Sequence, residues 1–249
     1  MKFISIYKSP NYNFRKKKAH IKYIIIHYTA MQTDLEALTH LCDKKNKVSS
    51  HFFINKVGKI YKLVDPKFRA WHAGISFWKG EKDINSNSIG IEISNSGYHL
   101  DFEKYDFGQI TSLINLLLYL KKKYNIDKND ILGHSDIAPY RKIDPGEKFP
   151  WYRLEKKKII YLPKKIKVQT SIEIDQYFKL IKIKSRKSRS LYMLNQIGYD
   201  TSSAKQNNKS YKNLIKAYQM HYNNECISGK LDIKTYEIIK SHFNQTLTN

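Results

Sequence analysis

The segment from Gly133 to Gly146 combines residue types that bind divalent metal ions. His134 follows a short apolar run, and a loop containing Pro139 leads to Asp144 ten residues later, directly before a second proline, Pro145. Another histidine, His27, ends a β-branched run near the start of the chain. Two imidazoles and one carboxylate leave a fourth position for water on Zn²⁺, which is typical of catalytic rather than structural zinc. Water on such an ion loses a proton near neutral pH and becomes a nucleophile.

These residue types alone do not establish a metal site. The chain contains nine histidines, and a single histidine is more often a structural residue than a ligand. A structural role therefore stays open for His27 and His134 at this point. The elements around them decide whether they can meet.

The first two-thirds of the chain predict strands interleaved with helices. Ile89, Ile91 and Ile93 alternate with smaller or polar residues, which indicates a strand with one face in the core. Glu92 lies on the opposite face, so its carboxylate can point at a site. Thr33 and Glu36 form a capping box that opens a helix. The expected elements are strands at 23–27, 51–55, 59–64 and 89–93, and helices at 33–41 and 107–124. Together they predict an α/β fold in which helices flank a mixed central β-sheet.

The last third has a different character. We expect a first domain at 1–165, a tether at 166–184, and a small helical domain at 185–249. Three helical segments, at 191–197, 211–222 and 232–243, predict a small three-helix bundle in the last of these. Gly198 is suited to end the first helix and Asp232 to begin the third.

Four segments together carry a resemblance to a known family. They are Ile-Ile-Ile-His-Tyr-Thr-Ala (24–30), Ser-Ser-His-Phe-Phe-Ile (49–54), Ser-Ile-Gly-Ile-Glu-Ile (88–93) and Gly-His-Ser-Asp-Ile-Ala-Pro through Lys-Ile-Asp-Pro-Gly (133–146). Residues 23–151 resemble the AmpD/AmiD-type N-acetylmuramoyl-L-alanine amidases, the amidase-2 family, which is related to peptidoglycan recognition proteins. The resemblance implies hydrolysis of the amide bond between N-acetylmuramoyl, or 1,6-anhydro-N-acetylmuramoyl, and L-alanine in peptidoglycan or muropeptides.

The resemblance also implies roles for individual residues. His27, His134 and Asp144 match the family's zinc ligands and would hold one Zn²⁺ per chain. Glu92 matches the catalytic glutamate, which would pass a proton from the attacking water to the leaving amine. Lys142 matches a lysine that faces the reacting carbonyl, where an ammonium would stabilise the oxyanion.

Other residues occur in sequence contexts that resemble those of the same family. Tyr28, Trp71 and His72 are expected to contact the sugar-peptide substrate, although a structural role for them stays open. His51 is expected to be structural. The helical segments at 191–249 resemble the three-helix peptidoglycan-binding domain, and a second weak site on one polymer would raise the effective concentration of the enzyme. The alternative is a bundle that only packs on the first domain.

Charge and composition test two competing functions. The chain has 45 Lys+Arg against 22 Asp+Glu, which would suit nucleic acid or another anionic partner. Only six of these cations are Arg, the residue suited to bidentate phosphate binding, so we expect no nucleic-acid partner. A non-catalytic peptidoglycan-binding protein remains the alternative function. No apolar run is long enough for a transmembrane helix.

The remaining expectations concern the state and place of the protein. We expect a monomer. The location is the bacterial cell envelope or periplasm if a leader has been removed, and the cytoplasm if Met1 is the true start.

Overall fold

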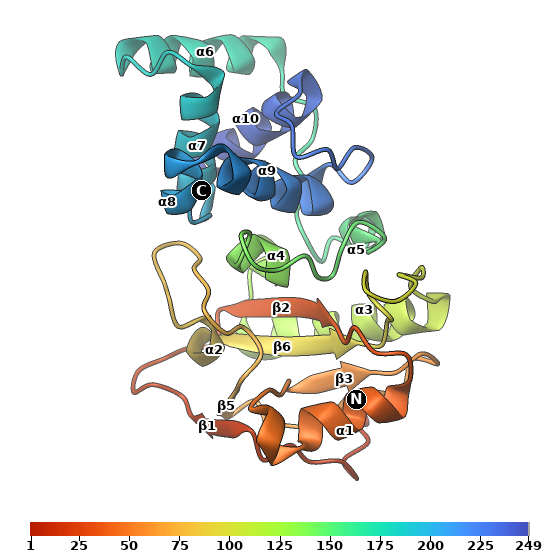
Figure 1. Cartoon of the computed structure of the whole chain (residues 1–249). Helices are drawn as coiled ribbons and strands as arrows, with labels where there is room; N and C mark the ends of the chain where they lie inside the picture. Colours follow the sequence, from red (N-terminus) through yellow and green to blue (C-terminus); the bar gives the residue numbers. More distant parts are fainter. Residues whose placement is uncertain (249) are drawn as a thin grey trace. The chain divides into compact units, whose positions relative to one another are not determined.

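A five-stranded sheet, in the order β4-β3-β6-β2-β7, forms the centre of the N-terminal part of the chain. Its strands β3, β6 and β2 are labelled in Figure 1. The computed structural model describes residues 1–248. Strand β3 pairs antiparallel with β4, and the other pairs in this sheet are parallel. A separate two-stranded sheet joins β1 and β5. The strands are β1 (Tyr12–Phe14), β2 (Tyr23–Tyr28), β3 (Phe52–Ile54), β4 (Ile60–Lys62), β5 (Phe68–Ala70), β6 (Ser88–Ile93) and β7 (Ile131–Gly133).

Helices follow or connect these strands and make up most of the C-terminal part. The α-helices are α1 (Asp34–Cys42), α2 (Ile84–Asn87), α3 (Phe107–Tyr124), α4 (His134–Ile137), α5 (Trp151–Lys156), α6 (Val168–Leu180), α7 (Arg186–Ile197), α8 (Ser202–Gln206), α9 (Asn208–Tyr222) and α10 (Ile233–Thr248), and a 3₁₀-helix spans Lys44–Asn46. The capping box at Thr33 and Glu36 begins α1 as expected. Helix α3 has the expected bounds.

Helices cover both faces of the central sheet. On one face, Phe53 of β3 packs in a cluster with Leu38 of α1. On the other face, the ring of Phe52 lies 5.1 Å from that of Phe3, which lies 5.9 Å from the ring of Tyr119 on α3. Consecutive residues of a strand point to opposite faces. The sheet is therefore buried on both sides, which explains why all six residues of β6 are buried.

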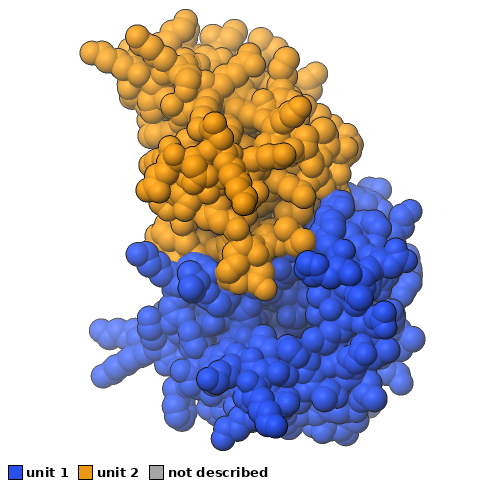
Figure 2. Space-filling model, viewed as in Figure 1, with its two compact units in different colours: residues 1–76, 82–134, 144–161 blue, residues 77–81, 135–143, 162–249 orange. Residues whose placement is uncertain are grey.

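The chain divides into two compact units, coloured separately in Figure 2. The first, here called the sheet unit, comprises residues 1–76, 82–134 and 144–161. The second, here called the helical unit, comprises residues 77–81, 135–143 and 162–249. The helical unit thus includes two short segments from within the expected first domain. This assignment differs from the boundaries expected from the sequence, which kept residues 1–165 together.

The helical unit has an aromatic core. The ring of Tyr192 on α7 lies 5.6 Å from that of Phe178 on α6 and 6.0 Å from that of Phe243 on α10. Helix α6 occupies most of the segment 166–184, where we expected a tether. It is helical because Ile174 and Phe178, four residues apart, are buried on one face.

The observed fold confirms the predicted α/β class with a mixed central sheet and helices around it. The three expected C-terminal segments are helices α7, α9 and α10, and α6 and α8 add to them. Gly198 ends α7, and the Asp232 carboxylate accepts a hydrogen bond from the Thr235 amide at the start of α10. Among residues 1–248, every helix is too short or too polar to cross a membrane.

Candidate metal centre

Three side chains of the sheet unit converge on one point. The Nδ1 atoms of His27 and His134 lie 2.9 Å apart, and the Oδ2 atom of Asp144 lies 3.0 Å from the first and 3.1 Å from the second. All three residues are buried. They form a group that could hold a metal ion, so the predicted meeting of two imidazoles and a carboxylate is confirmed.

Strand register brings the site together. In adjacent parallel strands, His27 of β2 pairs with Glu92 of β6, and Ile26 of β2 pairs with Gly133 of β7. His134 follows Gly133 directly as the first residue of α4, so Glu92, His27 and His134 lie at one level along three neighbouring strands or just beyond their ends. Neighbouring strands are about 4.8 Å apart. Three adjacent parallel strands, β6, β2 and β7, therefore bring three polar side chains to the same edge of the sheet.

The geometry fits a small tetrahedral ion. A tetrahedral zinc site with ligand distances of about 2.0–2.1 Å has ligand-to-ligand edges of about 3.3 Å. The three observed separations, 2.9 to 3.1 Å, come close to this value. Burial alone would raise the pKa of Asp144, but the imidazoles of His134 and His27 outweigh it and hold this pKa below its usual value. The carboxylate is therefore ionised, as a ligand must be.

A hydrogen-bond relay fixes the proton of His27. The Ser88 hydroxyl donates to the Ile84 carbonyl at 2.6 Å, so its oxygen accepts from His72 Nε2 at 3.1 Å. His72 Nδ1, 3.0 Å from His27 Nε2, then accepts the proton of that nitrogen. The assignment follows from the partners of each nitrogen. It leaves a lone pair on His27 Nδ1, the atom that faces His134 and Asp144.

His134 is oriented in the same way. Its Nε2 donates to the Ala73 carbonyl at 3.0 Å, which leaves the Nδ1 lone pair toward the site. Metal-binding histidines commonly donate their second ring nitrogen to a carbonyl or another acceptor. Both histidines therefore have the tautomer that a metal ligand requires.

The contact of His72 with His27 was not predicted from the sequence, which left His72 open between a substrate contact and a structural role. A signal was present in Gly90, a glycine in the middle of an isoleucine-rich strand, since such a glycine often marks the close approach of another group. A Cβ at Gly90 would lie 2.3 Å from His72 Cγ. The strand needs glycine there because the imidazole of His72 packs directly over it.

The other predicted site residues have different surroundings. Glu92 is buried at the same level as His27. Tyr28 is half-buried, and its pKa is raised by burial first and by the charge of Asp144 second, so its hydroxyl stays protonated. The indole nitrogen of Trp71 donates to Asn13 at 2.9 Å. Lys142 belongs to the helical unit, where its amide donates to the Ala138 carbonyl at 3.0 Å.

His51 is fully buried beside Arg15. Its Nδ1 accepts from the Gly90 amide at 3.0 Å, and its Nε2 donates to the Phe68 carbonyl at 3.1 Å. Burial, and then the charge of Arg15, lower the pKa of His51 to about 3. A neutral imidazole bonded to two backbone groups is consistent with the structural role expected for this residue.

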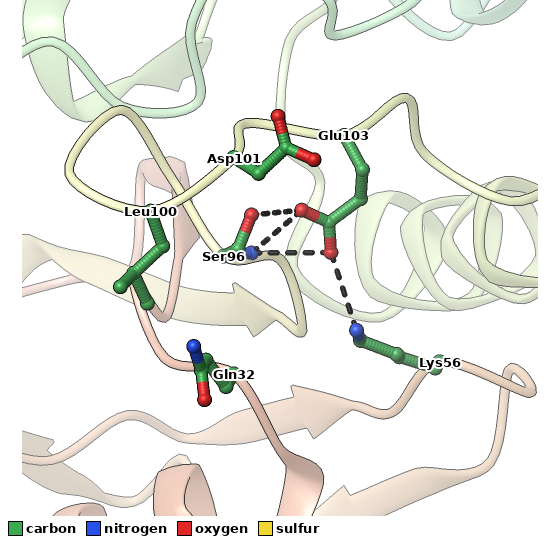
Figure 3. Close-up of a pocket in the computed structure, with 6 residues that line it drawn as sticks. All are labelled: Gln32, Lys56, Ser96, Leu100, Asp101 and Glu103. Carbon is green, nitrogen blue, oxygen red and sulfur yellow. Dashed lines mark hydrogen bonds and ion pairs between the residues drawn. The ribbon is translucent and has the colours of Figure 1, made fainter.

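A pocket of about 390 Å³ lies in the sheet unit beyond the ends of β2 and β6 (Figure 3). Glu103 accepts hydrogen bonds from the amide and hydroxyl of Ser96 and forms an ion pair with Lys56 at 3.4 Å. These bonds outweigh the effect of burial and lower the pKa of Glu103. The residues that line the pocket are Gln32, Lys56, Ser96, Leu100, Asp101 and Glu103.

Comparison with known proteins places the chain in a family. The N-acetylmuramoyl-L-alanine amidase family matches residues 17–147. The chain is 33% identical to the N-acetylmuramoyl-L-alanine amidase AmiD of Escherichia coli over 233 residues, which cover 89% of this chain and 82% of that protein. It is 31% identical to the 1,6-anhydro-N-acetylmuramyl-L-alanine amidase AmpD of Haemophilus influenzae, over 59% of this chain and 87% of that protein.

A solved structure gives the same result. The complex of E. coli AmiD with anhydro-N-acetylmuramic acid-L-Ala-D-gamma-Glu-L-Lys superimposes with a TM-score of 0.78 at 31% identity, and the match covers 93% of this chain and 92% of that one. The mixed sheet and the buried His-His-Asp group thus define a hydrolase of the amidase class. The chain belongs to the N-acetylmuramoyl-L-alanine amidase family.

Proposed function

We propose that the protein is a zinc-dependent amidase that hydrolyses the bond between N-acetylmuramoyl, or its 1,6-anhydro form, and L-alanine in peptidoglycan or muropeptides. The observation that carries the proposal is the convergence of His27, His134 and Asp144, whose ligand atoms lie within 3.1 Å of one another. The comparisons support the same proposal, because the chain belongs to an amidase family and the structure of E. coli AmiD has been solved with an anhydromuramoyl peptide as substrate.

The metal and the protein would share the chemistry. Zinc, when bound, supplies a Lewis acid for the scissile carbonyl and a water that is nucleophilic at neutral pH. His27 and His134 would hold it through their Nδ1 atoms, and Asp144 through Oδ2. Burial of all three side chains excludes bulk water and strengthens their electrostatic interaction with a cation.

Glu92 is proposed as the general base and acid. It pairs in register with His27, so its carboxylate starts about one strand spacing from a ligand. It would remove a proton from the attacking water as that oxygen bonds to the carbonyl carbon. The same proton would then go to the nitrogen of L-alanine as the amide bond breaks, which releases the peptide with a free amino terminus.

Three further roles are proposed. Lys142, two residues before Asp144, would stabilise the oxyanion of the tetrahedral intermediate. The protonated hydroxyl of Tyr28 and the partly exposed ring of Trp71 would contact the substrate. The helical C-terminal segment would bind peptidoglycan, which would increase the time that the enzyme spends on the polymer. We further propose a monomer that acts on the cell envelope or its soluble fragments.

The test is product analysis by mass spectrometry on a soluble anhydromuramoyl tripeptide and on intact sacculi. We expect peptides with a free L-alanine amino terminus, and none from Glu92→Gln. Glu36→Gln is the matched control, because glutamine also completes the capping box of α1. Tight binding of the muropeptide by the zinc-loaded chain without any product would instead support the non-catalytic binding protein.

A further inference from the structure

In the sequence, Asp136 lies between His134 and Asp144, two of the proposed metal ligands. It has no role in the mechanism proposed above. It is on the short helix α4, two residues after His134, and its side chain is fully buried. One carboxylate oxygen accepts a hydrogen bond from the Tyr199 hydroxyl at 2.5 Å, and the other accepts from His221 Nδ1 at 2.7 Å. All these contacts lie inside the helical unit.

The two donors come from separate C-terminal elements. Tyr199 follows the glycine that ends α7, and His221 is in the last turn of α9. The ring of Tyr199 lies 4.9 Å from that of Trp78, nearly perpendicular to it. The Tyr140 hydroxyl also donates to the Asp200 carbonyl at 2.6 Å. The segments 77–81 and 135–143 therefore fold together with the C-terminal helices.

A buried carboxylate is costly unless hydrogen bonds compensate for its lost hydration. Charge-assisted hydrogen bonds are also roughly twice as strong as neutral ones. The bonds from Tyr199 and His221 to Asp136 consequently hold the segment Ser135–Ile143 in one conformation. His134 and Asp144 are the residues on either side of this segment. The segment therefore connects two of the three ligand groups directly along the chain.

We propose that Tyr199 and His221 are positioning residues for the metal centre. By holding Asp136 they keep His134 and Asp144 at ligand distance, so the C-terminal helices serve the active site as well as any polymer they bind. This inference rests on the proposed zinc site. The positioning role can be distinguished from polymer binding, because it changes zinc affinity and can be measured without peptidoglycan.

The test uses the full chain and four variants. Tyr199→Phe removes one hydroxyl, and His221→Leu removes the second donor. His221→Asn keeps an amide donor near the position of Nδ1. Tyr218→Phe is the matched control, because Tyr218 is also fully buried in the helical unit and its hydroxyl bonds to His242 instead, at 3.3 Å. Zinc affinity is measured by chelator competition, and site geometry by the visible spectrum of the Co²⁺-loaded protein.

Tyr199→Phe and His221→Leu should each weaken zinc binding about 10-fold, the scale seen when outer partners of a metal site are lost. The Co²⁺ spectrum should shift in both variants. His221→Asn should recover most of the affinity, and Tyr218→Phe should stay within about twofold of wild type. The unfolding midpoint of the zinc-free protein separates these effects from a general loss of stability.

Equal zinc affinity in Tyr199→Phe, His221→Leu and Tyr218→Phe would overturn the positioning role while leaving the zinc site intact. A wild-type chain that binds no zinc would instead refute the proposed function, and the positioning role with it. The two failures are therefore distinguishable from the wild-type measurement alone.

Discussion

Replacing Ser88 by alanine should weaken zinc binding although Ser88 touches no proposed ligand. In the wild-type protein the Ser88 oxygen accepts the Nε2 proton of His72, and His72 in turn accepts the Nε2 proton of His27. In Ser88→Ala the buried Nε2–H of His72 loses its acceptor, which costs about 1–3 kcal/mol. His72 can avoid this cost by moving its proton to Nδ1.

That shift works against metal binding. A proton on His72 Nδ1 would point directly at the proton on His27 Nε2, with no acceptor between them. His27 would therefore carry its proton on Nδ1, the atom that faces Asp144. Zinc would then have to reverse both tautomers before it could bind. We expect the affinity to fall about 10-fold, or about 1.4 kcal/mol, at the lower end of the effect of outer partners on metal sites.

The matched control is Ser50→Ala. Ser50 is equally buried, and its hydroxyl donates to the Phe52 carbonyl at 2.9 Å without contacting a histidine side chain in any described hydrogen bond. Both variants should lose stability in urea unfolding of the zinc-free protein. Only Ser88→Ala should lose zinc affinity in chelator competition. The relay is refuted if Ser88→Ala binds zinc within about twofold of Ser50→Ala.

Three more predictions follow from the site. Glu92→Gln should keep zinc yet lower kcat by about 10²–10⁴, and normal turnover would contradict its role. Lys142→Met should lower kcat by about 10²–10³ with little change in KM, whereas a change in KM alone would assign it to binding. The pKa of His51 is about 3 in the fold and 6.5 in a free chain, so below about pH 6.5 the unfolded state binds more protons. The free energy of unfolding, from urea titrations, should therefore fall as the pH is lowered from about 6.5 to about 3, and a flat profile would contradict the burial of neutral His51.

The convergence of His27 and His134 could be predicted from local sequence patterns. His27 lies near the end of β2 and His134 directly follows β7, and parallel strands bring their carboxyl ends to one edge of the sheet. The alternation around Ile91 predicted a strand with one face in the core, whereas all six residues of β6 are buried. Glu92 is nevertheless the register partner of His27. Asp144 was recognisable only from its spacing in the family motif.

The supports of the site could not be predicted in the same way. The contact of His72 with His27 joins residues 45 positions apart, and no periodicity reports such a pair. Only Gly90 hinted that another group packs on β6. Helix α6 was missed because its lysine-rich surroundings concealed two buried residues, and the pairing of Asp136 with His221 spans 85 positions.

The most direct test of the proposed zinc centre is anomalous diffraction at the zinc edge from crystals of the zinc-loaded full chain. We expect one zinc peak at about 2.0–2.1 Å from the Nδ1 atoms of His27 and His134 and about 2.0–2.2 Å from a carboxylate oxygen of Asp144. A peak bound elsewhere, or ligation through Nε2 of either histidine, would contradict both the proposed centre and the hydrogen bonds that orient it.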